Sequence, residues 1–354
     1  MGIQQSDNAR SKAIDRFLKS QPVAINVKDL VDGVLNGNKH ILAKAITLVE
    51  SNLAKHKDLA TQVIHEILPK SGNSIRVGIT GVPGVGKSTF IEALGTYLTQ
   101  QGIKTAVLAV DPSSNINKGS ILGDKTRMNQ LSVDPLAFVR PSPSSGTLGG
   151  VANATRESIL LCEAAGYEVI LVETVGVGQS EYLVKEMVDF FLLLMLSGAG
   201  DEIQGIKRGI MEMADALYVN KADGENKIMS RKAAQAYRNA LHLFPAREDG
   251  WITETGTCSA IDNVGVDTVW NSISKFKTQQ TENGWFETRR KTQSKTWLME
   301  QLNHSLKDFF FNQDLVKQNI DSITKEVVSG KSTPFAGSQK LMGLFQKGIA
   351  NSKK

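Results

Sequence analysis

The sequence predicts an α/β fold with a mostly parallel sheet, preceded and followed by helical regions. Strand-like and helix-like segments alternate from Ile75 to about Phe276. Most of the strand-like segments are continuous apolar runs, as strands covered on both faces require. A complete phosphate-binding loop, Gly81–Thr89, also stands between the first of these strands and the first of these helices. Together these observations predict a P-loop nucleotide-binding domain.

The pattern divides the chain into three parts. Residues from about Asp7 to Leu68 have helical periodicity, with apolar positions such as Leu30, Val34 and Leu42, and Pro69 then breaks the pattern. We expect a helical N-terminal domain over residues 1–70, a P-loop domain over residues 71–281, and a C-terminal helical extension over residues 282–354. The extension either packs back on the core or forms a dimerisation arm, and its pattern fits both.

Seven segments of the central part are predicted to be strands, and most of them are continuous apolar runs. They lie near Arg76–Thr80, Thr105–Val110, Ala137–Arg140, Glu168–Val172, Phe190–Leu196, Ala216–Asn220 and Thr255–Ser259. Connections rich in glycine, serine and proline follow their carboxyl ends. Open α/β sheets bind their ligands at that edge, so we expect the site there.

Composition excludes several classes of function. The 41 basic and 36 acidic residues are dispersed along the chain, so no basic stripe predicts a nucleic-acid partner. The longest apolar run, Phe190–Leu196, is far shorter than the ~20 residues of a membrane span. The start of the chain fits a myristoylation pattern, but no second anchor stands nearby, so no membrane attachment is expected.

The two cysteines indicate the compartment. Cys162 and Cys258 are too few for a disulfide scaffold and fit a reducing environment. The polar N-terminus, with charges of both signs, resembles neither a secretory signal nor a transit peptide. The sequence therefore predicts a cytoplasmic protein.

The phosphate-binding loop fits the pattern G-x-x-x-x-G-K-[S/T]. Its residues are Gly81, Val82, Pro83, Gly84, Val85, Gly86, Lys87, Ser88 and Thr89. The glycines let backbone N–H groups turn inward around a β-phosphate, and the following helix N-terminus favours an anion. Lys87 is expected on the β/γ oxygens, and Ser88 provides a hydroxyl for Mg²⁺. The chain is predicted to bind a nucleoside triphosphate with Mg²⁺.

A second motif selects the base. Asn220, Lys221 and Asp223 form an N-K-x-D element at the end of a predicted strand. The Asp223 carboxylate can accept both the N1–H and the 2-amino group of guanine, donors that adenine lacks. Lys221 is expected along the base plane, and Asn220 is expected to tie this loop to the phosphate side. A lone N-K-x-D is often a surface turn, but its place after a P-loop favours a guanine site.

A third segment adds to the base site. Cys258, Ser259 and Ala260 follow a short β-like stretch and precede a predicted helix. Backbone N–H groups in this position are suited to the guanine O6. With the N-K-x-D element, this loop predicts GTP and GDP as the ligands.

Two further loops contain candidate switch residues. Asp111 ends the second predicted strand, where an aspartate can orient Mg²⁺ or its waters; an isolated Asp-Pro is also a common turn or cap. Asp124 lies in a glycine-hinged segment further on. Glu173 occupies the aspartate place of a D-x-x-G element, and the N–H of Gly176 is expected to reach the γ-phosphate.

The loop Ser197–Arg208 is rich in glycine and charge and contains Lys207. Such loops are usually surface connections, but this one lies on the same edge as the others, which makes it a candidate partner contact. No glutamine directly follows Gly176, where Val177 stands, and Gln179 is further along. We therefore expect slow intrinsic hydrolysis that a partner raises.

These motifs together resemble the MeaB/ArgK/MMAA family of GTPases, the chaperones of cobalamin-dependent acyl-CoA mutases. The resemblance runs from about Gly78 to Trp270 and is most specific at Glu173–Glu181. The other segments that carry it are Gly81–Thr89, Asp111–Ser114, Gly119–Met128, Arg140–Gly150, Gly198–Glu212 and Asn220–Gly224.

The resemblance implies a SIMIBI-class GTPase fold whose C-terminal arm makes homodimers. It implies that the phosphates and Mg²⁺ are served by Lys87, Ser88, Asp111, Asp124 and Glu173. It further implies that Asp223 reads guanine and that Lys207 belongs to a third switch facing a mutase. The implied function is a GTP-hydrolysing chaperone that gates adenosylcobalamin at a methylmalonyl-CoA-type mutase.

Two alternatives come from other classes. A kinase of a small molecule or transport protein needs an acceptor pocket, for which the chain offers no separate domain, and Asp223 favours GTP over ATP. A metal-insertion chaperone usually carries His-rich tracts or paired Cys and His ligands, whereas the five histidines here are scattered. Neither the identity of the client mutase nor the hydrolysis rate follows from the sequence.

Overall fold

The computed structural model describes residues 26–51, 53–110, 128–140, 148–174, 180–198 and 208–351. The chain forms two compact units, Met1–Ser274 and Lys275–Lys354. The first contains the whole sheet and the second is helical.

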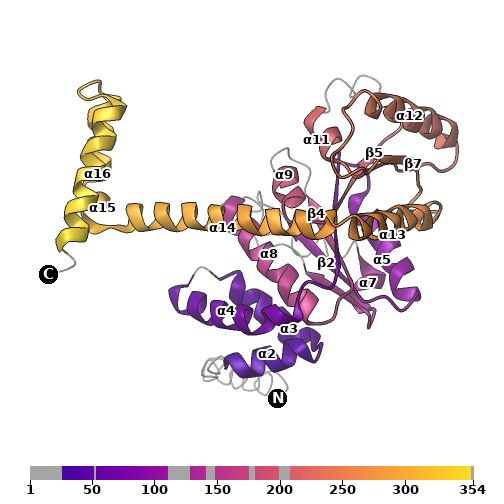
Figure 1. The fold of residues 1–354 in the computed structure, drawn as a ribbon, viewed down its shortest axis with the longest axis horizontal. Helices are drawn as coiled ribbons and strands as arrows, with labels where there is room; N and C mark the ends of the chain where they lie inside the picture. The colour runs from indigo at the N-terminus through magenta and orange to yellow at the C-terminus, as the bar shows by residue number, and fades with distance from the viewer. Residues whose placement is uncertain are drawn as a thin grey trace, which may run out of the picture. The chain divides into compact units, whose positions relative to one another are not determined.

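The sheet has seven strands, all parallel, in the order β3-β2-β4-β1-β5-β6-β7 (Figure 1). Their bounds are β1 Ile75–Gly81, β2 Thr105–Val110, β3 Ala137–Arg140, β4 Val169–Thr174, β5 Phe190–Met195, β6 Ala216–Val219 and β7 Glu254–Thr257. Every predicted strand is present, with ends displaced by at most two residues. One displacement matters for the site: β4 continues to Thr174, so Glu173 lies within the strand rather than after it.

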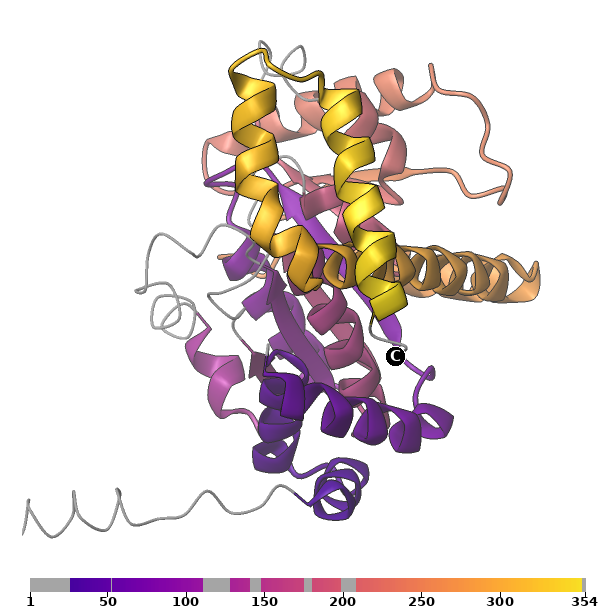
Figure 2. The ribbon, with the colours of Figure 1, turned by 90° about the vertical axis from the view of Figure 1, so that its left-hand side faces the viewer.

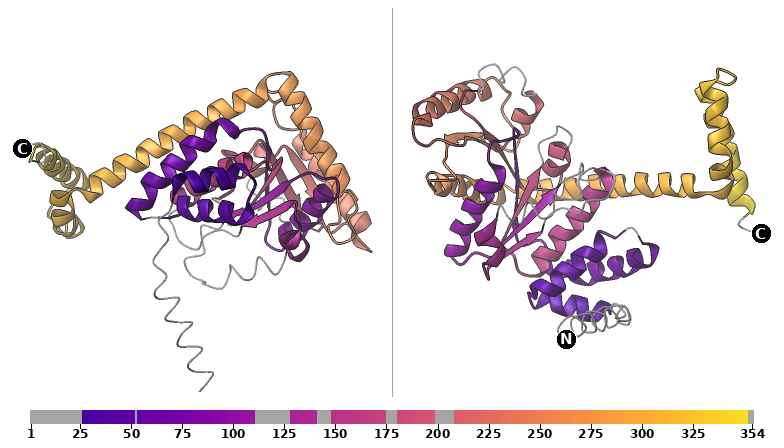
Figure 3. Two further views of the ribbon diagram at one scale, coloured as in Figure 1. Left: turned by 90° about the horizontal axis from the view of Figure 1, so that it is seen from below. Right: turned by 180° about the vertical axis from the view of Figure 1, so that it is seen from behind.

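Helices cover both faces of the sheet, as its apolar strands require (Figures 1 and 3). The helices that alternate with the strands are α5 Lys87–Gln100, α7 Asn129–Val133, α8 Leu148–Ala164, α9 Ser180–Lys185, α11 Arg208–Met213 and α12 Asn226–Leu241. Helix α13, Val266–Glu282, begins in the first unit and continues into the second. The β1–β2 and β3–β4 connections run in opposite directions along the sheet. Because such crossovers are right-handed, α5 and α8 lie on opposite faces.

The N-terminal helices are α2 Val27–Leu35, α3 Lys39–Val49 and α4 Ala54–Ile67, followed by a 3₁₀ turn, Leu68–Lys70. The asparagines that precede α2 and α3 cap them by accepting backbone hydrogen bonds. All three helices contact α8, and Arg140 at the end of β3 pairs with Glu50. These helices therefore belong to the same compact unit as the sheet; a domain boundary at residue 70 remains a prediction.

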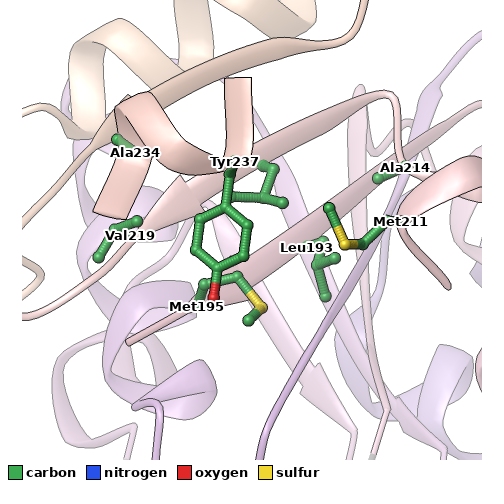
Figure 4. Close-up of a cluster of buried hydrophobic side chains, with 8 residues drawn as sticks. Leu193, Met195, Met211, Ala214, Val219, Ala234 and Tyr237 are labelled. Atoms are coloured by element: carbon green, nitrogen blue, oxygen red, sulfur yellow. The ribbon is translucent and has the colours of Figure 1, made fainter. Parts of the chain in front are cut away.

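A hydrophobic cluster joins α11 and α12 to the sheet (Figure 4). Tyr237 of α12, which is 1% exposed, and Met211 of α11 lie against side chains of β5 and β6. The other members are Leu193, Met195, Ala214, Leu217, Val219 and Ala234. Burying a methionine side chain contributes about 1.5–3 kcal/mol, so Met211 anchors α11 to the core.

The second unit contains α14 Trp285–Asn312, α15 Asp314–Val328 and α16 Pro334–Asn351. The helical character predicted after Thr281 is present. Helices α15 and α16 lie side by side (Figure 2). None of the residues of α14 is buried within the chain, and its exposed large apolar residues are Leu298, Met299, Leu302, Leu306, Phe309 and Phe311. Of the helices in the described ranges, none has the length and apolar character to cross a membrane.

Candidate active site

Four strands bring the described site residues to one edge of the sheet. The loop Gly81–Thr89 follows β1, and the central position of β1 between β4 and β5 places Glu173 beside it. The segments Asn220–Asp223 and Cys258–Ala260 follow β6 and β7. The remaining predicted site residues, Asp111, Asp124, Gly176 and Lys207, lie outside the described residues.

Two glycines of the phosphate-binding loop are required by its geometry. Gly81 has φ +154°, and a Cβ there would lie 2.4 Å from the carbonyl oxygen of Leu194. Gly86 has φ +90°, and a Cβ there would lie 3.2 Å from Nδ2 of Asn220. Gly86 also precedes the first residue of α5, and no side chain caps that helix. The first-turn N–H groups of α5 therefore suit an anion, as the sequence predicts.

Lys87 begins α5 and is buried, with 9% exposure. Its Nζ donates to the carbonyl oxygen of Gly81 at 2.9 Å, which holds the ammonium within the loop. Burial lowers the pKa of Lys87, and the nearby carboxylates of Glu173 and Glu181 partly offset this effect. Because an ammonium has three N–H donors, Lys87 keeps donors for phosphate oxygens.

Ser88 and Glu173 place a hydroxyl and a carboxylate side by side. Oγ of Ser88 donates to Oε1 of Glu173 at 2.9 Å. A hydroxyl and a carboxylate are hard oxygen ligands, and Mg²⁺ is usually held by one or two such groups together with phosphates and water. Across the described ranges, no three His, Cys, Asp or Glu side chains cluster as a metal site. The pair therefore fits a Mg²⁺ shared with a nucleotide.

Asn220 links the base loop to the phosphate loop. It is buried, and its Nδ2 donates to the carbonyl oxygen of Val85 at 2.9 Å. Its Oδ1 accepts from the backbone N–H of Ala260 at 3.2 Å and lies 3.7 Å from Sγ of Cys258. Burial raises the pKa of Cys258 to about 12, so this thiol is neutral and can donate. One side chain thus connects three segments, including the link to the phosphate side that the sequence predicts.

Asp223 is oriented by a neighbouring hydroxyl. Oγ of Ser259 donates to Oδ2 of Asp223 at 2.8 Å and accepts from the N–H of Asp262 at 3.2 Å. An ionised carboxylate has about four lone-pair sites, so Asp223 retains the acceptors that guanine N1–H and N2–H need. From the sequence we expected only backbone groups of Cys258–Ala260 at the base, and the role of the Ser259 hydroxyl was missed.

Two contacts in the site were not expected from the sequence motifs. The N–H of Ala260 is already bonded to Asn220, so its contact with guanine O6 stays a prediction. Glu181, in the first turn of α9, is 4% exposed and lies close enough to Lys87 to raise its pKa. Sequence reasoning gave Glu181 no role, because nothing in the spacing places α9 beside the phosphate loop.

The family comparison agrees with this geometry. The family model described as "Methylmalonyl Co-A mutase-associated GTPase MeaB" matches residues 42–314. The chain belongs to the MeaB family. It is therefore a P-loop GTPase that binds guanine nucleotides, and the predicted fold class and enzyme class are confirmed.

Relatives from bacteria and animals match between 78% and 95% of the chain. The GTPase ArgK of Escherichia coli is 50% identical over 279 residues, which is 78% of this chain and 84% of that protein. A probable GTPase of Mycobacterium tuberculosis is 47% identical over 318 residues, 89% of this chain and 95% of that protein. The mitochondrial methylmalonic aciduria type A homolog of Mus musculus is 41% identical over 353 residues, 95% of this chain and 85% of that protein.

A solved structure shows the same fold. The crystal structure of a LAO/AO transport system kinase matches this MeaB-family chain with a TM-score of 0.72 and 38% identity. It covers 91% of this chain and 99% of its own.

Proposed function

We propose that this MeaB-family GTPase uses its nucleotide state to gate the loading or protection of adenosylcobalamin at a methylmalonyl-CoA-type mutase. The family match over residues 42–314, whose description names that mutase, carries the proposal. The methylmalonic aciduria name of the mouse relative supports it. The hydrogen bonds of Asn220 also support it, because they connect the base-binding loop to the phosphate loop.

We assign the site residues as follows. The N–H groups of Gly81–Thr89 bind the phosphates, Lys87 binds the β/γ oxygens, and Asn220, Lys221, Asp223 and Cys258–Ala260 hold guanine. Ser88, Glu173 and Asp111 are the residues that would hold Mg²⁺, which neutralises charge on the phosphate oxygens when bound. The hydrogen bond between Ser88 and Glu173 fits this assignment.

The remaining assignments concern the loops that precede α9 and α11 and the segment after β2. The N–H of Gly176 is assigned to the γ-phosphate, and Asp124 to the Mg²⁺ and phosphate region. Lys207 is assigned to the mutase-facing loop. These roles rest on the family relationship, since the three residues lie outside the described ranges.

We also infer a homodimer formed through α14. Leu298, Leu302 and Leu306 recur every four residues and are 67%, 48% and 56% exposed. That spacing places them on one face of the helix. An exposed apolar stripe of this kind is typical of a surface that another helix covers. Here we assign that helix to a second copy of the chain.

A kinase is the alternative function, because the solved relative is described as a transport system kinase. The two functions differ in the fate of the γ-phosphate. Hydrolysis releases one inorganic phosphate for each GDP formed, whereas a kinase transfers it to an acceptor. Measuring both products with purified protein and GTP separates them, and equal amounts support the GTPase.

The proposed role is tested by adding a methylmalonyl-CoA-type mutase and measuring GTP hydrolysis. We expect the mutase to raise the rate, and Lys207→Ala to remove most of this stimulation while GDP affinity stays nearly constant. Lys232→Ala, an exposed lysine on α12, is the matched control and should be stimulated normally. If the mutase changes the GTP hydrolysis rate of neither the unaltered protein nor the Lys232→Ala variant, the chaperone role is refuted and the GTPase assignment remains.

A further inference from the structure

Two short helices, α9 and α11, follow two of the loops at the ligand edge. Helix α9, Ser180–Lys185, comes directly after residues 175–179, and α11, Arg208–Met213, comes directly after residues 199–207. The two helices contact each other, and Figure 1 shows them on the same side of the sheet. Their contact therefore joins the ends of two loops that are far apart in the sequence.

The contact depends on a tyrosine and a glycine. The phenolic oxygen of Tyr182 on α9 lies 2.6 Å from the position that a Cβ of residue 209 on α11 would occupy. Any side chain at this position would overlap that oxygen. Glycine inside a helix costs about 1 kcal/mol relative to alanine. The space taken by Tyr182 is the physical reason for a glycine here.

Two other side chains of α9 join it to β1 and to the residue that precedes β6. Val184 is fully buried, and its Cγ1 lies 2.9 Å from where a Cβ of Gly78 in β1 would stand. Lys185 pairs with the buried carboxylate of Asp215 at 2.8 Å, and Asp215 stands only two residues beyond the end of α11. Because β1 leads into the phosphate loop, α9 is packed between that strand and α11.

The residue before Tyr182 is a buried glutamate. Glu181 is 4% exposed, and its negative charge partly offsets the lowering of the Lys87 pKa by burial. A phosphate bound at Lys87 adds negative charge beside this buried carboxylate, and like charges repel. Helix α9 thus contacts β1, which leads into the phosphate loop, through Val184, and α11 through Tyr182.

We propose that Tyr182 is a positioning residue that links the position of α11 to the nucleotide bound in the phosphate loop, through its contact with Gly209. A change at the phosphate site shifts α9 through its contact with β1, and Tyr182 passes this shift to α11. Met211 then repacks within the hydrophobic cluster of β5, β6 and α12. The inference deepens the proposed function, since it names the route by which nucleotide state reaches the loop assigned to the mutase.

The geometry allows a matched set of variants. Gly209→Ala places a Cβ 2.6 Å from the oxygen of Tyr182, whereas ordinary contacts begin at 3.4 Å. The oxygen is the end of a partly exposed side chain and can move aside, so the variant should fold. Tyr182→Phe removes the oxygen, after which the nearest ring atom is Cζ at 3.9 Å. The double variant therefore restores an ordinary contact.

The measurement is amide hydrogen exchange of peptides covering residues 208–215 in the full chain, without any mutase. In the unaltered protein, exchange should differ between GDP and a non-hydrolysable GTP analogue. We expect this difference to be lost in Gly209→Ala, weakened in Tyr182→Phe and regained in the double variant. Ile228→Ala, at an exposed position of α12, is the control and should leave the difference unchanged.

Three results would overturn the proposal. The first is equal exchange of the 208–215 peptides with both nucleotides in the unaltered protein. The second is a Gly209→Ala variant that keeps the full difference in exchange between the two nucleotides. The third is a double variant that does not regain this difference. Because no mutase is present, these results are independent of the test of the chaperone role. A GTPase that a mutase does not stimulate could still show this coupling.

Discussion

Replacing Asp223 with asparagine should weaken guanine nucleotides and favour xanthine nucleotides. The Asp223 carboxylate is held by the hydroxyl of Ser259 at 2.8 Å, and it offers acceptors to the two guanine donors. Asparagine presents an N–H₂ group in place of one carboxylate oxygen. This N–H₂ group would face a donor of guanine, whereas in xanthine a carbonyl oxygen replaces the 2-amino group and can accept from it. Ser259 can still donate to the remaining carbonyl oxygen of Asn, so the loop should keep its structure.

The magnitude follows from the number of bonds lost. A hydrogen bond to a charged group contributes about 1.5–3 kcal/mol, and the carboxylate is expected to accept two. Asparagine removes one of these acceptors and leaves its guanine donor facing an N–H₂ group, and an unsatisfied donor costs about a further 1–3 kcal/mol. The total cost should be about 3 kcal/mol or more, which is about a hundredfold or more in GDP affinity.

The assay is a competition of GDP, XDP and ADP against a labelled nucleotide. Asp262→Asn makes the same chemical change at an exposed residue of the next loop, and it should leave all three affinities nearly unchanged. The assignment of Asp223 would be refuted by an Asp223→Asn protein that keeps its GDP affinity, or by an unaltered protein that binds ADP as tightly as GDP.

Three further predictions follow from single features of the structure. Lys87→Ala removes the charge held within the phosphate loop and should lower the GTP hydrolysis rate about a hundredfold or more, measured as phosphate release. Burial raises the pKa of Glu157 from 4.5 to about 7. The folded state therefore binds more protons between these values, and stability should fall by up to about 3 kcal/mol as pH rises through them. Glu157→Gln should flatten this slope in urea titrations at pH 5 and pH 8. Replacing Leu302 and Leu306 with glutamate should convert a dimer to a monomer in light scattering, whereas Leu243→Glu, an 82% exposed control, should not.

The local features of the fold were predictable from the sequence. Strands β1 to β6 each have a run of mostly apolar residues, and Gly81–Thr89 has a fixed spacing, so short windows suffice to find them. The extension of β4 through Glu173 was missed because Glu173 and Thr174 are polar in a strand otherwise read from apolar residues. Their pairing with β1 and β2 in the sheet keeps them in the strand.

The contacts between distant segments were not predictable. The hydroxyl of Ser259 on Asp223, the carboxylate of Glu181 beside Lys87 and the contact of Tyr182 with Gly209 each join residues from different elements. Such contacts depend on strand order and on the placement of short helices, which a single sequence does not encode in its spacing. Asn220 is the exception, because its motif predicts both its place and its link to the phosphate loop.

The central claim is that nucleotide state and mutase binding are coupled, and affinity titrations test it most directly. GDP and a non-hydrolysable GTP analogue are titrated into the protein with and without a methylmalonyl-CoA-type mutase. Thermodynamic linkage relates two ratios. The mutase must change the ratio of the GDP and GTP-analogue affinities by the same factor by which its own affinity differs between the GDP-bound and the analogue-bound protein. Coupling of about 1–3 kcal/mol gives a factor of about 5 to 150. The account predicts a factor in this range from both directions, and a ratio that the mutase leaves unchanged would contradict it.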